Sequence, residues 1–334
     1  MTSPDHAIEV RGISKSYPTG FWRRRVTVLS DLSFSVGRNE IVGFLGPNGA
    51  GKTTTIKIIT RLGFPDAGTV SLFGSGDWSR PEIRRQMGFM PEQPYFYEYL
   101  TGEEFLALCG HLNGVPREEI ADRSRAILSR VGIGDAGKTA IRKYSKGMMQ
   151  RLGLAQALLH DPELVILDEP MSGLDPLGRM EVRNLIREMK EAGKTVFFSS
   201  HIISDVEALC DRVIMLHKGR KVAEGTVEEL MGKEGIRYVE LLFSPVPAQE
   251  WLSRVDFSQE GRGEIRGAAI VIRAKDFEDA DRWIQKFRES GSLLRSCVPV
   301  KKRLEDIYVE QVAAHENGDP SRMRGASGGG GRGE

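Results

Sequence analysis

A glycine-rich loop contains the residues with the clearest chemistry: residues 46–53 read Gly-Pro-Asn-Gly-Ala-Gly-Lys-Thr. It follows the apolar run Ile41–Leu45 and precedes a helical pattern that begins near Lys52. Glycines let successive backbone N–H groups point at one anion, and a helix N-terminus adds partial positive charge. Lys52 supplies a cation for phosphate oxygens, and the Thr53 hydroxyl is placed to bind Mg²⁺. We predict a nucleotide phosphate site formed by Gly46, Asn48, Gly49, Gly51, Lys52, Thr53 and Thr54.

A second motif is a pair of acids, Asp168 and Glu169, directly after the apolar run Leu164–Leu167. Such a run predicts a buried parallel strand, and ligands of open α/β sheets bind at the carboxyl ends of the strands. Asp168 is then placed to hold Mg²⁺, through water. Glu169 is free to polarise an attacking water as general base, a role worth about 10²–10⁴ in rate. The pair therefore indicates hydrolysis of the bound nucleotide.

Residues 144–148, Tyr-Ser-Lys-Gly-Met, resemble the signature segment of the ATP-binding cassette (ABC) family, whose usual form is Leu-Ser-Gly-Gly-Gln. The resemblance to this family covers roughly residues 8–230 and implies the ATP-hydrolysing subunit of a membrane transporter. It also implies that Ser145 and Gly147 meet the γ-phosphate through a hydroxyl and a backbone N–H. Lys146 replaces a glycine, so a left-handed backbone there would cost energy. Ser145 is also a typical helix N-cap, and the two roles are compatible.

Further positions match the family's motifs in their usual order. By resemblance, Gln93 reaches Mg²⁺ and the attacking water, and His201 contacts the γ-phosphate. Asp175 ends the segment Ser-Gly-Leu-Asp, which resembles the loop through which two cassettes touch. Tyr17 resembles the aromatic residue that stacks on adenine, and an ordinary packing role is equally compatible. The resemblance thus implies Glu169, His201 and Gln93 as catalytic residues, and Thr53, Gln93 and Asp168 as ligands of Mg²⁺.

The chain contains one copy of each motif, whereas the family closes each ATP between the phosphate loop of one cassette and the signature segment of another. The resemblance therefore implies a homodimer closed by ATP, which opens when hydrolysis removes the γ-phosphate bridge. It also implies transmembrane permease subunits as partners. Residues 95–100, Tyr-Phe-Tyr-Glu-Tyr-Leu, lie where the family docks a short helix of its membrane subunit. A docking groove and local packing of these aromatic side chains both remain open.

The elements that would position these residues follow an α/β pattern. Short apolar runs at residues 41–45, 164–167, 195–199 and 212–216 alternate with helical stretches and predict a mixed, mostly parallel sheet. Residues 91–142 have a helical pattern and predict a helical insertion in this core. We expect a phosphate-loop NTPase domain over residues 1–230, a small α+β accessory domain over 236–313 and a disordered tail over 316–334.

The composition is that of an ordinary globular protein: of 334 residues, 40% are hydrophobic and 28% are charged, with a formal net charge of +1. This charge gives no basic field that would recruit nucleic acid, and we expect no such partner. We find neither a signal peptide pattern nor an apolar run that could span a bilayer. We therefore expect a location on the cytoplasmic face of the membrane, through a membrane subunit. The cysteines, Cys109, Cys210 and Cys297, are far apart and predict no zinc site.

The direction of transport depends on a short motif near the end of the chain. Residues 303–308, Arg-Leu-Glu-Asp-Ile-Tyr, resemble the closing motif of single-cassette ATPases that export drugs, lipids or polysaccharides, which favours export over import. An ordinary helix with capping acids would have the same sequence. The basic insertion Phe-Trp-Arg-Arg-Arg, residues 21–25, fits an exposed hairpin tip better than a contact with lipid headgroups. The main alternative function is a non-transport ABC ATPase that acts on ribosomes or DNA.

Overall fold

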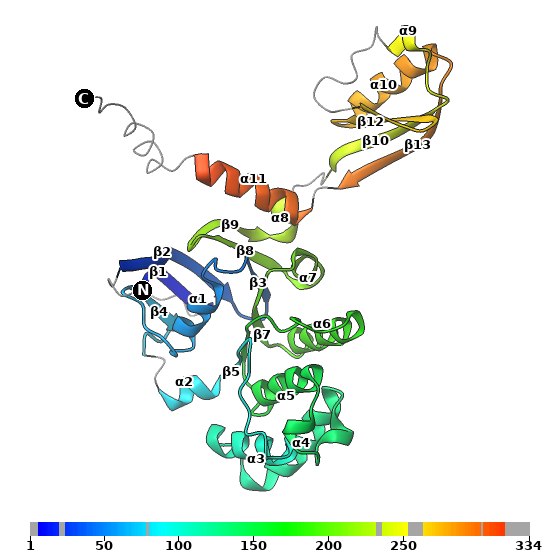
Figure 1. Ribbon diagram of the computed structural model, residues 1–334. Coiled ribbons are helices and arrows are strands. Elements are labelled where there is room, and N and C mark those ends of the chain that lie inside the picture. The colour runs from blue at the N-terminus through cyan, green and yellow to red at the C-terminus, as the bar shows by residue number, and fades with distance from the viewer. Residues whose placement is uncertain are drawn as a thin grey trace, which may run out of the picture. The chain divides into compact units, whose positions relative to one another are not determined.

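The computed structural model describes residues 6–19, 24–77, 80–231, 236–252, 263–301 and 303–317 (Figure 1). The chain divides into two compact units, one of Met1–Val227 with Tyr308–Glu334 and the other of Glu228–Ile307. The last helix, α11 (Leu304–Asn317), therefore begins in the second unit and continues into the first. Residues 318–334 of the predicted disordered tail and residues 21–23 of the basic insertion lie outside the described residues.

The central sheet of the first unit has the strand order β5-β6-β7-β3-β8-β9. Its neighbouring strands are parallel except β8 and β9, which form an antiparallel hairpin. β3, β6 and β7 are buried along their whole length, as expected for central strands covered on both faces. The prediction of an α/β core with a mixed, mostly parallel sheet is confirmed. The strands are β3 (Ile41–Leu45), β5 (Met87–Met90), β6 (Leu164–Leu167), β7 (Thr195–Ser200), β8 (Arg212–His217) and β9 (Arg220–Thr226).

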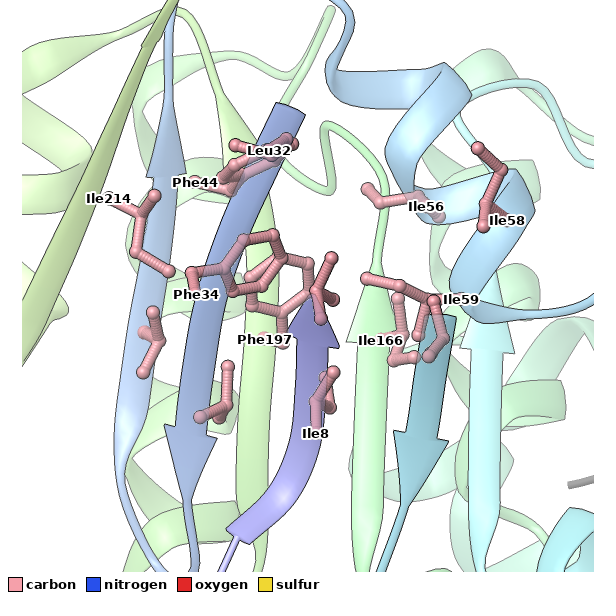
Figure 2. Close-up of a cluster of buried hydrophobic side chains, with 14 of the residues drawn as sticks. Ile8, Leu32, Phe34, Phe44, Ile56, Ile58, Ile59, Ile166, Phe197 and Ile214 are labelled. Carbon is pink, nitrogen blue, oxygen red and sulfur yellow. The ribbon is translucent and has the colours of Figure 1, made fainter. Parts of the chain in front are cut away.

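A second, antiparallel sheet of order β2-β1-β4 packs against the central one through apolar side chains (Figure 2). The ring of Phe34, on β2, stacks on that of Phe197, on β7, with their centroids 5.8 Å apart. Phe44, on β3, lies 5.4 Å from Phe197. Burial of such rings stabilises the packing of the two sheets and so fixes the positions of their strands. The strands are β1 (His6–Thr19), β2 (Arg24–Gly37) and β4 (Ala67–Leu72).

Helices pack on the central sheet and form a separate helical part. α1 (Lys52–Ile59) follows β3 directly, α5 (Lys146–Leu158) packs against β5, and α6 (Pro176–Glu191) and α7 (Ile203–Leu209) pack against β7. In the helical part, α3 and α4 pack together at Gly110 and Ile120, where a Cβ on the glycine would meet Ile120 at 3.1 Å. The helical part consists of α3 (Gly102–Asn113), α4 (Arg117–Arg130) and the 3₁₀ turns Gly134–Ala136 and Ile141–Lys143. The short helix α2 (Pro81–Arg85) precedes it.

The second unit is an antiparallel sheet of order β11-β12-β10-β13 with helix α10 packed on it. Its core centres on Phe287, whose ring stacks on Phe243 at 4.2 Å and meets Trp251 edge-on at 4.8 Å. No helix within the described ranges is both long and apolar enough to cross a membrane. The elements are α8 (Val227–Met231), β10 (Ile236–Ser244), α9 (Gln249–Leu252), β11 (Gly263–Arg266), β12 (Ala269–Ala274), α10 (Phe277–Glu289) and β13 (Leu293–Lys301).

Candidate functional site

The glycine-rich loop joins the carboxyl end of β3 to the first turn of α1. Gly46 N–H donates to Ser200 O at 3.2 Å, which ties the start of the loop to the end of β7. Gly51 has φ +108°, and a Cβ on it would lie 2.6 Å from Leu29 Cδ2, so this position requires glycine. The first turn of α1, residues 52–54, contains no acid, and its partial positive charge is available to an anion.

A hollow of about 460 Å³ opens beside this loop, a volume typical of small-molecule sites. It brings the loop together with Glu169 at the end of β6, Glu92 after β5 and Val28 on β2. Most of the phosphate-binding residues predicted from the sequence therefore border one space. Its described lining is Val28, Asn48, Gly49, Gly51, Lys52, Thr53, Thr54, Glu92 and Glu169.

The carboxylate of Glu169 lies between two basic side chains. Lys52 Nζ is 3.2 Å from Glu169 Oε1, and His201 Nδ1 is 2.8 Å from Glu169 Oε2. Lys52 Nζ also donates to Gly46 O at 2.7 Å, which directs the ammonium back under its own loop. The side chains of Lys52 and Glu169 are only 6% and 8% exposed, so this ion pair is poorly screened by water. An entering phosphate group would therefore compete with Glu169 for Lys52.

Asp168 is buried beside a hydroxyl from the phosphate loop. Ser199 Oγ donates to Asp168 Oδ1 at 2.6 Å and accepts from Glu169 N–H at 2.9 Å. Burial raises the pKa of Asp168, although hydrogen bonds from Ser199 and Thr53 act in the opposite direction. Thr53 and Asp168 thus place two hard oxygen donors together, a donor set that suits Mg²⁺. The residues present fit the metal that the sequence predicted.

Gln93 and Tyr17 are among the predicted residues that do not line this hollow. Gln93 is exposed and does not line it among the described residues, whereas its neighbour Glu92 does. The charge of Glu92 also contributes to the raised pKa of Asp168, behind the larger effect of burial. Tyr17 is 40% exposed on β1, and the ammonium of Lys15 lies 5.4 Å from the centre of its ring. Glu92 and Val28 are the lining residues that the sequence analysis missed.

A second hollow, of about 550 Å³, gathers the signature segment and the segment that ends at Asp175. Ser145 is the N-cap of α5, and its Oγ accepts from Met148 N–H at 3.2 Å. Asp175 is the N-cap of α6, and its Oδ1 accepts from Gly178 N–H at 2.9 Å. Lys146 begins α5 with a negative φ, so the altered signature imposes no left-handed strain at that residue. Ser145, Gly147 and Asp175 line this hollow, and none of the three lines the first.

Comparison with known proteins identifies the family. A family model described as "ABC transporter" matches residues 29–172. The chain is 39% identical to an ABC transporter ATP-binding protein of Nostoc sp., over 90% of this chain and 88% of the relative. The chain belongs to the ABC transporter ATP-binding proteins. A bacitracin transport ATP-binding protein of Bacillus licheniformis is 42% identical to this ABC protein, over 84% of this chain and 91% of the relative. A dimeric ATP-binding cassette solved with ADP and Pi is 25% identical, with a TM-score of 0.61, over 66% of this chain and 99% of the other.

The resemblance drawn from the sequence motifs is thereby confirmed. As a member of the ABC family, the protein binds ATP and hydrolyses it. The solved cassette also confirms that the chain contains the fold of an ABC ATPase.

Proposed function

We propose that this ABC ATPase powers an exporter and hydrolyses Mg²⁺–ATP in the hollow beside residues 46–53, with Glu169 as general base. The position of Glu169 supports this best, because its carboxylate lies 3.2 Å from Lys52 Nζ and 2.8 Å from His201 Nδ1. A base from the end of β6 and a cation from the phosphate loop therefore meet at one point. A water between them and a bound γ-phosphate would lie within reach of that base.

Each neighbouring residue has a distinct role in the proposed reaction. When ATP enters, Lys52 leaves Glu169 and pairs with phosphate oxygens. The freed carboxylate of Glu169 then accepts a proton from the attacking water. His201 holds Glu169 Oε2 and contacts the γ-phosphate. Thr53 and Asp168 would hold Mg²⁺, which neutralises charge on the phosphate oxygens when it is bound. We assign to Glu92, rather than to Gln93, the place after β5 that faces the metal, because Glu92 borders the hollow.

The two hollows support a homodimer closed by ATP. Asn48, Gly49 and residues 51–54 border the first hollow, whereas Ser145, Gly147 and Asp175 border the second, so one chain offers two half-sites. A related cassette was solved as a dimer with ADP and Pi. In the proposed dimer, ATP on the loop of one protomer meets the N-terminus of α5 in the other, whose partial positive charge favours phosphate.

The membrane partner is proposed from exposed aromatic residues and from the relatives. Tyr95, Tyr97 and Tyr99 are 94%, 53% and 76% exposed, directly after the residues that reach the ATP hollow. Phe96 instead packs edge-on against Phe105 with ring centroids 5.0 Å apart, so the run divides between local packing and an open surface. We propose that permease subunits bind this surface and hold the protein at the cytoplasmic face of the membrane. The similarity to a bacitracin transport ATP-binding protein favours export.

The role of Glu169 is tested with Glu169→Gln. The variant should bind ATP, hydrolyse it at least about 100-fold more slowly, because the amide cannot accept the proton, and accumulate as a dimer with ATP. Hydrolysis is measured by phosphate release, and assembly by size-exclusion chromatography with and without ATP. Glu163→Gln, which changes an exposed acid just before β6, is the matched control and should behave as wild type. Wild-type hydrolysis by Glu169→Gln would remove the assignment.

A further inference from the structure

The end of β8 and the two-residue turn that follows it, residues 216–219 and together called the β8–β9 turn, lie directly against the phosphate loop. Gly219 N–H donates to Ala50 O at 2.9 Å. Leu216 O lies so close to Gly46 that a Cβ on the glycine would be 2.5 Å from it. The loop therefore rests on this β8–β9 turn through one hydrogen bond and one close backbone contact. A displacement of the turn would displace the backbone N–H groups that hold phosphate.

The β8–β9 turn is also fixed to β2, which forms another wall of the ATP hollow. Ser30 N–H donates to Gly219 O at 3.0 Å. Lys218 and Gly219 have φ +46° and +78°, the left-handed pair of a tight two-residue hairpin turn. A Cβ on Gly219 would lie 2.1 Å from Val28 O, and Val28 lines the hollow. Two walls of the site thus depend on the position of one short turn.

The third neighbour of the β8–β9 turn is the last helix, α11. Tyr308 Oη lies 2.9 Å from His217 Nδ1 and 3.4 Å from Leu216 O. Two helical turns further on, Glu316 forms an ion pair with Lys218, and its Oε1 lies 3.6 Å from His217 Nε2. Both nitrogens of His217 therefore face α11, and the imidazole is largely buried, with 16% of the side chain exposed.

The hydroxyl of Tyr308 can satisfy both neighbours at once. When His217 donates from Nδ1 to Tyr308 Oη, the phenol proton is free to be donated to Leu216 O. Burial raises the pKa of Tyr308, so the phenol keeps that proton at neutral pH. This chain of hydrogen bonds ends at the carbonyl that touches Gly46.

We propose that Tyr308 is a positioning residue for ATP binding, which holds the β8–β9 turn in place and thereby fixes the shape of the phosphate loop. The inference rests on the proposed assignment of residues 46–53 as the site of the ATP phosphates. It gives a role to the sequence motif at residues 303–308, of which Tyr308 is the last residue. The residue touches no reacting atom and acts through Leu216 and His217.

The test is Tyr308→Phe in the full chain, which keeps the ring and removes only the hydroxyl. Loss of this hydroxyl removes the hydrogen-bond partner of His217 Nδ1 and one hydrogen bond to Leu216 O, and ATP affinity should fall about three- to tenfold. The dissociation constant of a fluorescent ATP analogue and the KM for ATP should both rise, while kcat at saturating ATP stays within about twofold. Val309→Ala, at a neighbouring residue that is 61% exposed on the same helix, is the matched control and should match wild type. Glu316→Gln should shift affinity in the same direction by a smaller factor.

The outcomes separate this inference from the function on which it rests. If wild type binds the analogue and Tyr308→Phe binds it equally well, the positioning role is overturned and the assigned loop stands. If Tyr308→Phe lowers the unfolding temperature and kcat but leaves the dissociation constant unchanged, the residue is merely structural and the inference fails. If wild type does not bind the analogue, or binds it equally well after Lys52→Ala, the assigned loop fails and the inference with it.

Discussion

At the scale of single residues, Glu169 shows how the proposed ATP site is organised. Its backbone has φ +51°, a left-handed conformation that costs a residue with a side chain about 1–2 kcal/mol. Its N–H is held by Ser199 Oγ at 2.9 Å, and its carboxylate by Lys52 and His201. The surrounding contacts therefore maintain a strained residue that aims one carboxylate at the phosphate loop. Such strain is typical of residues with a catalytic role.

The glycines of the loop give a prediction at the same scale. Gly51→Ala should destabilise the nucleotide-free protein by about 1–3 kcal/mol more than Gly49→Ala, because its Cβ would lie 2.6 Å from Leu29. At Gly49, which has φ +80°, no described atom lies within 4 Å of an added Cβ. Gly49→Ala therefore carries only the conformational cost of about 1 kcal/mol. Urea unfolding without nucleotide measures both variants, and equal losses of unfolding free energy would contradict the clash.

From the sequence alone, we could predict those residues of the proposed site whose placement follows from a local pattern. Asp168 and Glu169 end a fully apolar strand, and the loop of residues 46–53 is defined by its glycines. Between Glu92 and Gln93 no such pattern exists, since both are polar and follow the same strand. Which of them faces the hollow depends on the path of the connection after β5, and no local sequence pattern determines that path. The position of Glu92 therefore required the structure.

At the scale of elements, the N-termini of α5 and α6 combine stabilising caps with the proposed second half-site. Ser145 caps α5 and Asp175 caps α6, and both border the second hollow. A cap places an oxygen and free backbone N–H groups at one point, which is also what contact with a phosphate or with a second cassette requires. The sequence predicted the N-cap role of Ser145, because the residue type alone indicates it. It could not predict that α11 packs on the β8–β9 turn, since His217 and Tyr308 are 91 residues apart.

Helix α3 allows a test of helix capping outside the proposed ATP site. Thr101 Oγ1 accepts from Glu104 N–H at 3.2 Å, and Glu104 Oε2 accepts from Thr101 N–H at 2.8 Å, a complete capping box. Thr101→Ala should destabilise the protein by about 1 kcal/mol, whereas Thr101→Ser should cost little because it keeps the oxygen. Hydrogen exchange of the first-turn amides of α3 measures the effect locally. Equal exchange rates in the Ala and Ser variants would argue against the cap.

At the scale of the whole molecule, the two units differ in how their cysteines are placed. In the first unit, burial raises the pKa of Cys109 to about 11 and that of Cys210 well above its ordinary value. Cys297, in the second unit, is exposed. Because the thiolate is the reactive form, thiol chemistry on the native protein should begin in the second unit.

This difference gives a pH-dependent prediction. At pH 8, iodoacetamide should modify Cys297 first, because only about one Cys109 thiol in a thousand is ionised when the pKa is about 11. A raised thiol pKa means that the thiolate appears only as pH rises, so modification of Cys109 should accelerate about tenfold per pH unit up to that pKa. Mass spectrometry of peptides from the native protein measures each rate. Modification of Cys109 as fast as that of Cys297 at pH 8 would contradict the burial of the Cys109 thiol. The urea-unfolded chain is the control.

The course of the chain through its two units affects how the ATPase can be made. The chain leaves the first unit at Val227 and returns to it at Tyr308, so the residues between form an insertion rather than an appended domain. On the ribosome, the loop of residues 46–53 is synthesised before the second unit, whereas most of the helix that contacts the β8–β9 turn is synthesised after it. If Tyr308 positions the loop as proposed, a nascent chain acquires full ATP affinity only after the second unit has been translated.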